Sequence, residues 1–180
     1  MNKSEKIILL GKSGSGKDYL TRKLIEKGLK PCIKTTTRPM RVNEVQNVSY
    51  NFIDDSKFES LLNDGRFLFH QTFLVTPTNK SPQKWHYGVT KEEFNNSQVF
   101  IMTPGEISQI EESDRKKCFV VYLDIDRKVR EQRLSFRNDQ NDSIKRRLDA
   151  DELDFLNFKD YDLKITDPEF TADEVYELMD

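Results

Sequence analysis

The stretch GKSGSGKD, residues 11–18, constrains the fold of this chain more than any other feature of its sequence. It follows the apolar run IILL and precedes a segment in which apolar residues recur at helical spacing. Glycines let such a loop turn its N–H groups toward an anion, and the following helix directs its positive end to the same point. Strand, glycine-rich loop and helix together predict an α/β domain that binds a phosphate group.

The last position of this loop departs from the usual motif, G-x-x-x-x-G-K-[ST]. The usual hydroxyl binds Mg²⁺, but this chain carries Asp18 there. A carboxylate is a hard oxygen ligand and suits Mg²⁺ directly or through water. Alternatively, Asp18 only complements the positive end of the helix dipole, which contributes about 0.3–1 kcal/mol. The neighbouring Lys17 is expected to reach the terminal phosphates as a point charge.

Strands and helices are expected to alternate along most of the chain. The predicted strands are short apolar runs at residues 6–10, 66–75, 99–102, 118–125 and 162–167. The predicted helices span residues 17–28, 56–64, 127–136, 143–156 and 171–179, with Ser56 and Thr171 as caps. This alternation favours a mostly parallel sheet with helices on both faces. Residues 33–90, rich in Thr, Tyr and Phe, break the rhythm and predict an inserted subdomain with antiparallel pairing.

Charge and cysteine content narrow the class of protein. The net charge is -2, with 29 basic and 31 acidic residues, so no global basic field indicates nucleic-acid binding. No apolar run approaches the roughly 20 residues of a membrane span, and the N-terminal run is too short for a signal peptide. Cys32 and Cys118 are the two cysteines, and both lie in apolar contexts. We therefore expect a cytoplasmic protein without a disulfide framework.

A second informative stretch is KTTTRPMRVNEVQNVSYNF, residues 34–52. Arg38 and Arg41 stand three positions apart around Pro39, in a segment expected to be extended. Two guanidinium groups held in this way suit a bound phosphate monoester. Tyr50 adds a hydroxyl donor on an aromatic body. The alternative for this stretch is a solvated loop with a salt-bridged edge.

Together the two stretches resemble the guanylate kinase family. The second matches its T-T-R-x-x-R-x-x-E-x-x-x-x-x-Y-x-F pattern with Thr36, Thr37, Arg38, Arg41, Glu44, Tyr50 and Phe52. The later segments YGVTKEEF, VREQRLSFRND with IKRRL, and KDYDLKITD resemble further family motifs in the same order. The resemblance implies a three-layer P-loop kinase fold with a mostly parallel five-stranded sheet. It also implies a single domain over residues 1–180, with a core at 1–32 and 96–180, an acceptor-binding subdomain at about 33–95 and a helical lid at about 127–148.

The resemblance further implies ATP-dependent phosphoryl transfer to a nucleoside monophosphate, with GMP or dGMP as the leading acceptor and Mg²⁺ as cofactor. The residues implied for binding ATP are Gly11, Ser13, Gly14, Ser15, Gly16, Lys17, Asp18 and Tyr19. Those implied for the acceptor are Thr35, Arg38, Arg41, Tyr50 and Tyr87. Lys17, Arg133 and Arg137 are implied as catalytic residues, and Asp18 as the metal ligand. The alternative for Arg133 is an ordinary charge on a helix surface. The expected partners are small molecules, without nucleic acid or membrane, and the expected state is a monomer or homodimer.

Several positions differ from the family pattern, and some of them read the base in the family. The departures are Lys34, Phe69, Val89, Met102 and Pro104. Phe69 replaces a Glu that reads the guanine ring, and a Phe cannot accept its N–H bonds. Met102 and Pro104 replace the acids of a D-I-D strand end, where Glu106 lies just beyond. Residues 75–86 form a longer loop than in the family. Phosphate handling is thus kept while base reading is largely lost, so the acceptor stays open.

Two alternatives follow from these departures. The loop GKSGSGKD, the segment YGV and the missing D-I-D resemble the ribose 1,5-bisphosphate phosphokinases, which phosphorylate a sugar phosphate. The other alternative is a catalytically inactive guanylate-kinase-like binding module. That reading predicts decay of the phosphate loop, yet the loop keeps its three glycines and Lys17.

Overall fold

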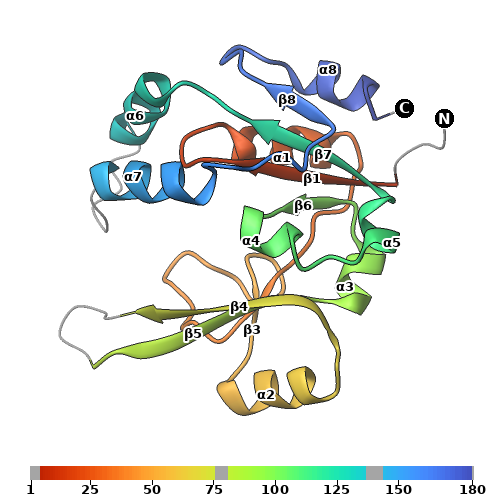
Figure 1. The fold of residues 1–180 in the computed structure, drawn as a ribbon. Helices are drawn as coiled ribbons and strands as arrows, with labels where there is room; N and C mark the ends of the chain where they lie inside the picture. Colours follow the sequence, from red (N-terminus) through yellow and green to blue (C-terminus); the bar gives the residue numbers. More distant parts are fainter. Residues whose placement is uncertain (1–4, 76–80, 137–143, 180) are drawn as a thin grey trace. The chain divides into compact units, whose positions relative to one another are not determined.

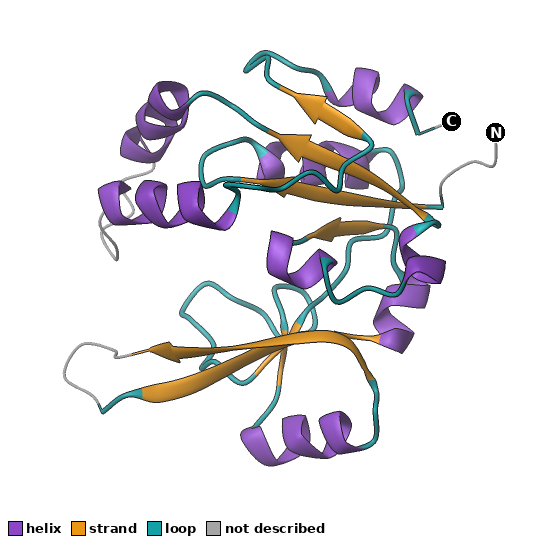
Figure 2. Ribbon diagram, in the orientation of Figure 1, coloured by secondary structure: helices purple, strands orange, loops and turns teal. Residues whose placement is uncertain are grey.

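The computed structural model describes residues 5–75, 81–136 and 144–179, and the chain divides into two compact units. Unit 1 comprises Met1–Pro31 and Gln98–Asp180, and unit 2 comprises Cys32–Ser97. Figure 1 shows the course of the chain through both units, and Figure 2 shows their helices and strands. Each unit has its own four-stranded sheet.

Unit 1 is built on a parallel sheet. Its strands, in spatial order, are β6 (Val99–Ile101), β1 (Lys6–Gly11), β7 (Cys118–Leu123) and β8 (Leu163–Ile165). All three strand pairs are parallel, so the predicted α/β class with a parallel sheet is confirmed. Every residue of β1 is buried, which explains why its sequence is a continuous apolar run rather than an alternating one.

The parallel sheet has four strands in the described part of the chain, not the five that the family resemblance implied. At the β6 edge, Pro31 forms only an isolated parallel bridge with Val99. Both Gln98 and Val99 donate their backbone N–H groups to the carbonyl of Lys30. Pro31 has no N–H group with which to continue a ladder. The place of a fifth strand is therefore reduced to a single bridge.

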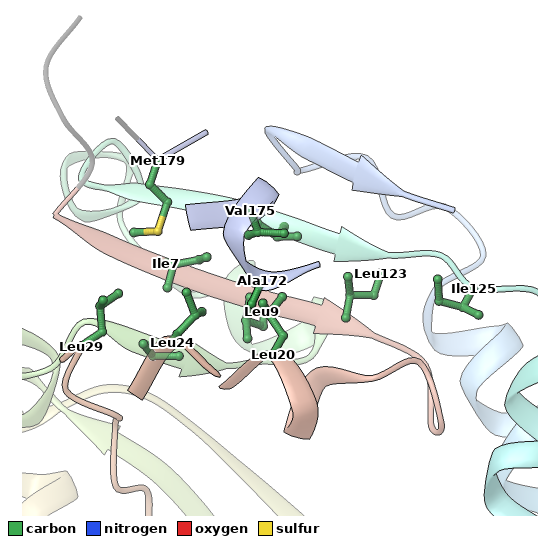
Figure 3. Packing of buried hydrophobic residues seen from close by; sticks show 12 residues of the cluster. Ile7, Leu9, Leu20, Leu24, Leu29, Leu123, Ile125, Ala172, Val175 and Met179 are labelled. Atoms are coloured by element: carbon green, nitrogen blue, oxygen red, sulfur yellow. The ribbon is translucent and has the colours of Figure 1, made fainter. Parts of the chain in front are cut away.

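The described part of unit 1 contains six helices, and the first and last of them supply buried residues to one apolar cluster on this sheet. The helices are α1 (Lys17–Glu26), α4 (Pro104–Ile107), α5 (Glu112–Arg115), α6 (Arg127–Phe136), α7 (Ile144–Asp154) and α8 (Ala172–Glu177). In the cluster, Leu20 and Leu24 of α1 and Val175 of α8 meet Ile7 and Leu9 of β1, as Figure 3 shows. These contacts fix the start of α1 directly after the end of β1, which positions the glycine-rich loop between them.

Unit 2 contains a mixed sheet and two helices. The strands, in spatial order, are β3 (Asn51–Phe52), β2 (Thr35–Thr36), β5 (Gln83–Thr90) and β4 (Phe67–Val75), and the helices are α2 (Asp55–Asn63) and α3 (Lys91–Asn96). Strand β5 pairs antiparallel with both β2 and β4, whereas β3 pairs parallel with β2. The antiparallel pairing predicted for this region is confirmed.

Three local predictions were wrong or incomplete. Residues 83–86, assigned to a long loop, belong to β5, where Trp85 pairs with Phe73 of β4. Helix α2 is capped by Asp54, which accepts from the N–H of Lys57 at 2.7 Å, and not by Ser56. The short helices α3, α4 and α5 have six residues or fewer, too few to show a helical period in the sequence. By contrast, Thr171 caps α8 as predicted, in a capping box with Glu174.

A search of the helices in the described segments finds none that is long and apolar enough to cross a bilayer.

Candidate active site

The glycine-rich loop of unit 1 joins the end of β1 to the start of α1. Gly14 and Gly16 adopt φ angles of 77° and 106°, in the left-handed region that glycine reaches without strain. A Cβ atom on Gly14 would also lie 2.8 Å from the carbonyl oxygen of Arg130. Gly16 is the N-cap of α1 and supplies no side-chain acceptor to its first N–H groups. The loop therefore has the backbone form that an anion site at a helix start requires.

Lys17 and Asp18 stand at the beginning of α1. The Nζ atom of Lys17 donates to the carbonyl oxygens of Gly11, at 2.5 Å, and of Lys12, at 3.1 Å, so the side chain folds back across the loop. Asp18 is exposed in the first turn of the helix. In the part of the chain that the structure describes, no three His, Cys, Asp or Glu side chains group so as to hold a metal ion. Asp18 is the acidic residue in the first turn of α1.

Two carboxylates of α7 contact the same loop. Asp151 Oδ2 accepts from the backbone N–H of Ser13 at 2.7 Å. Glu152 forms an ion pair with the ammonium group of Lys12, and its other oxygen accepts from Arg130 Nη2 at 2.5 Å. Burial by itself raises the pKa of Glu152, but Lys12 and Arg130 outweigh it and lower the pKa below its ordinary value. Glu152 is therefore ionised at neutral pH.

Arg130 is a functional candidate that the sequence reasoning missed. Its side chain is 1% exposed, and Nε donates to the carbonyl of Ile125 at 2.9 Å. Nη1 lies 3.4 Å from the carbonyl of Ser13. The available signal was its position one helical turn before Leu134, on the buried face of α6. A buried arginine on an apolar face needs carboxylate partners, and these come from α7, whose sequence shows no such pattern.

A cavity of about 590 Å³ lies beside the loop. Its lining residues are Gly14, Gly16, Tyr19, Arg133, Phe136, Pro168, Glu169, Phe170 and Thr171. Tyr19 and Phe170 meet edge to face, with ring centroids 6.1 Å apart. Arg133 donates to the carbonyl of Pro168 at 2.8 Å and approaches that of Ser15 at 3.3 Å. Aromatic walls with a few polar groups suit a planar ring next to the loop. Arg137, the other predicted lid arginine, lies outside the described residues.

Arg38 is the centre of the predicted acceptor residues in unit 2. It is 4% exposed and binds Glu44 through two parallel bonds, Nη1 to Oε2 at 2.9 Å and Nη2 to Oε1 at 2.6 Å. The rings of Tyr50 and Phe52 lie 5.4 and 5.6 Å from its guanidinium carbon. Burial opposes the charge of Arg38, but the bonds to Glu44 more than offset it and raise its pKa. Arg38 in turn lowers the pKa of Glu44.

The other predicted acceptor residues differ in how closely they join Arg38. The ring centroids of Tyr50 and Tyr87 are 6.1 Å apart. Burial raises the pKa of Tyr87, and the nearby Arg38 lowers it in part, so the phenol keeps its proton at neutral pH. Thr35 is buried and accepts from Asn51 Nδ2 at 3.2 Å. Arg41 is exposed, and its backbone N–H donates to Glu44 at 2.7 Å. The structure thus brings together Arg38, Tyr50 and Tyr87. Thr35 takes part in the pairing of β2 with β3 and β5.

Three of the positions that depart from the family pattern are used for packing. Phe69 and Val89 form a cross-strand pair in unit 2 and are 2% and 0% exposed. Met102 is buried in unit 1. Glu106 is buried as well and completes the capping box of α4, where it accepts from the N–H of Thr103 at 2.8 Å. These side chains hold the fold in this structure, and Glu106 is committed to a helix cap.

Comparisons with known proteins agree on one family. The family model described as guanylate kinase matches residues 3–179. The guanylate kinase of Nostoc sp. (strain PCC 7120) is 30% identical over 92% of this chain and 83% of its own length. That of Coxiella burnetii is 35% identical over 51% of this chain, and the match spans only 41% of that protein. The crystal structure of guanylate kinase from Anaplasma phagocytophilum has a TM-score of 0.66 at 21% identity, covering 98% of this chain and 86% of that chain. At this identity the structural likeness supports the fold.

Proposed function

Because this chain belongs to the guanylate kinase family, we propose that it transfers a phosphoryl group from ATP to a nucleoside monophosphate, with GMP or dGMP as acceptor. The observation that carries this proposal is the family match over residues 3–179, which includes the phosphate loop with its three glycines and Lys17. The two sequence relatives named above and the solved structure are all called guanylate kinase. A sugar-phosphate kinase and an inactive binding module are not favoured.

In this proposal unit 1 binds ATP. The loop N–H groups and the start of α1 hold the β- and γ-phosphates, and Lys17 leaves the carbonyls of its own loop to pair with them. The aromatic cavity takes the adenine ring. Arg133, already beside the loop, adds positive charge near the phosphates, and Arg137 is assigned the same task by the family pattern. Stabilising charge on the phosphoryl oxygens is most of what this reaction requires of the protein.

Unit 2 binds the acceptor in this proposal. Arg38, Arg41, Tyr50 and Tyr87 hold the monophosphate, with Thr35 as a further candidate. Glu44 keeps the Arg38 guanidinium in one orientation before the substrate arrives, which reduces the ordering that binding must impose. The neutral phenol of Tyr87 donates a hydrogen bond to a phosphate oxygen. We also expect a cytoplasmic protein that works as a monomer or homodimer.

A panel of acceptors tests the proposed function. A coupled assay of ADP release with Mg²⁺-ATP is run with GMP, dGMP, the other nucleoside monophosphates and ribose 1,5-bisphosphate. We expect turnover with GMP and dGMP to exceed that with every other acceptor. Turnover with the sugar phosphate alone would contradict the nucleotide assignment. Absence of turnover, together with absence of ATP binding, would indicate a binding module.

Asp18 is the residue proposed to hold Mg²⁺. Mg²⁺ usually takes one or two protein carboxylates and completes its shell with substrate phosphates and water. An exposed carboxylate next to the loop lysine fits that pattern. When bound, the ion would neutralise charge on the ATP phosphates.

Replacing Asp18 by Ser is expected to raise the Mg²⁺ concentration for half-maximal activity about tenfold, because a neutral hydroxyl replaces a charged ligand. The measurement is a Mg²⁺ titration of the initial rate at saturating ATP and acceptor. Asp55→Ser is the matched control, since Asp55 occupies the first turn of α2 in unit 2. If Asp18→Ser leaves the titration unchanged, Asp18 acts only as a charge at a helix start.

A further inference from the structure

We propose that Asp151 and Glu152 of α7 act as a carboxylate latch, which holds the phosphate loop in the way a nucleotide phosphate does and gives way when ATP binds. The loop would then be partly satisfied by the protein itself in the absence of nucleotide. This inference rests on the proposed binding of ATP phosphates by the loop. It concerns two residues of α7 to which the family pattern assigned no role.

Asp151 competes directly with a nucleotide phosphate for one N–H group of the loop. Its Oδ2 atom accepts from the backbone N–H of Ser13 at 2.7 Å. Ser13 belongs to the loop, between Gly11 and Gly14. A carboxylate oxygen and a phosphate oxygen both carry negative charge and accept the same N–H group. The amide has a single hydrogen, so a phosphate oxygen gains this bond only when Asp151 releases it.

Glu152 holds the charged side chain of Lys12, the residue before Ser13 in the loop. It pairs with the Lys12 ammonium, whose side chain is only 13% exposed. Asp124 stands 3.9 Å from the same ammonium and adds negative charge. In this arrangement the charge of Lys12 is neutralised by carboxylates of the protein. Release from Glu152 would make the Lys12 charge available to the ATP phosphates.

Arg130 is the fixed part of the latch. The buried guanidinium binds Glu152 at 2.5 Å and lies 3.4 Å from the Ser13 carbonyl. It thus joins α7 to the loop through Ser13, the residue whose N–H binds Asp151. The side chains of Asp151 and Glu152 are 19% and 37% exposed, so both carboxylates can turn toward solvent when a phosphate takes their partners. Arg130, at 1% exposure, is expected to keep its position.

Competition of this kind predicts opposite changes in nucleotide affinity and stability. Asp151→Asn removes the charge that competes with phosphate, so the affinity for Mg²⁺-adenylyl imidodiphosphate should rise about tenfold, which corresponds to about 1.4 kcal/mol. The KM for ATP should fall by a similar factor, and the KM for GMP should not change. The melting temperature without nucleotide should fall, because a charge-assisted bond is lost. A purely structural contact would lower both affinity and stability.

The experiment is calorimetric titration of the full chain with Mg²⁺-adenylyl imidodiphosphate, accompanied by thermal melts. Asp149→Asn is the matched control, because Asp149 lies on the same helix but pairs with Arg127 on the exposed surface. It should bind with wild-type affinity. Glu152→Gln tests the second half of the latch and should also tighten binding, through the release of Lys12.

The outcomes separate this inference from the proposed function. If the wild-type chain binds the nucleotide analogue and neither Asp151→Asn nor Glu152→Gln binds it more tightly, the latch is wrong and the kinase proposal stands. If Asp151→Asn does not fold, the result with Glu152→Gln decides. If no variant binds the analogue and the acceptor panel shows no turnover, both proposals are wrong.

Discussion

Replacement of Lys17 by Met is expected to lower kcat for phosphoryl transfer about a thousandfold, with little loss of stability. The lysine begins α1 and its ammonium already lies against the loop carbonyls of Gly11 and Lys12. Removing it takes a full positive charge from the place where the transferring phosphoryl group gains negative charge. Lys17 is half-buried and lies outside the apolar cluster, so the core stays intact. Steady-state kinetics with ATP and GMP, and thermal melts, measure the two effects.

Lys23→Met is the control for Lys17→Met, because it removes the same charge from the same helix. Lys23 lies in the last turn of α1 and pairs with Glu26 at 2.6 Å on the surface. Its replacement should change kcat less than about twofold, since exposed ion pairs contribute little. If Lys17→Met kept its rate within about tenfold of wild type, the loop lysine would not be the catalytic charge assumed here.

Replacement of Arg38 by Met is expected to raise the KM for the acceptor about a hundredfold and to leave the KM for ATP within about twofold. Arg38 is held by Glu44 and flanked by two aromatic rings in unit 2. Its loss removes charge-assisted hydrogen bonding to the acceptor phosphate, and a hundredfold rise corresponds to about 2.7 kcal/mol, within the range of about 1.5–3 kcal/mol for one such bond. Steady-state kinetics with each substrate varied in turn measure the two constants.

A second variant tests whether the orientation of Arg38 or only its charge accounts for acceptor binding. Glu44→Gln keeps Arg38 but weakens the two bonds that orient it, so the acceptor KM should rise less than in Arg38→Met. Because Arg38 lowers the pKa of Glu44, the carboxylate is ionised at neutral pH, and the pair is lost only as the pH falls through that lowered pKa. Arg66→Met, which removes an exposed arginine paired with Glu92, is the control. An equal rise of both KM values in Arg38→Met would contradict its assignment to the acceptor.

The elements with strong local signals were predictable from the sequence. The unbroken apolar run before the loop is buried along all of β1, and α6 has the bounds 127–136 that its periodicity predicts. The N-cap of α2 was harder to predict from the sequence, because Asp54 and Ser56 are both favourable N-cap residues. Only the backbone geometry selects Asp54. The start of β5 at Gln83 is polar on both faces, so no alternation marked it as a strand.

The candidate site was predictable only where its chemistry is local in the chain. Glycine spacing and a lysine predict the loop, and the Arg38–Glu44 pair stands within one motif. The contacts of Arg130 with Glu152 and of Asp151 with Ser13 join residues 22 and 138 positions apart. No period or spacing links such residues, because their meeting depends on how α6, α7 and the loop pack together. Tertiary packing alone brings these groups to the loop.

The burial of Phe69 against Val89 restricts how this chain can change its acceptor. Phe69 is 2% exposed inside unit 2. A glutamate at that position, as in the family pattern, would lose its water, and the Lys34 ammonium, now 5.7 Å from the centre of the Phe69 ring, is a cation close enough to compensate part of that cost. A single Phe69→Glu substitution therefore requires the side chains that now pack around the ring, Val89 among them, to rearrange so that Lys34 can pair with the carboxylate. Substitutions at exposed positions can change acceptor selectivity without a large loss of stability, whereas a substitution at position 69 also changes the stability of the fold.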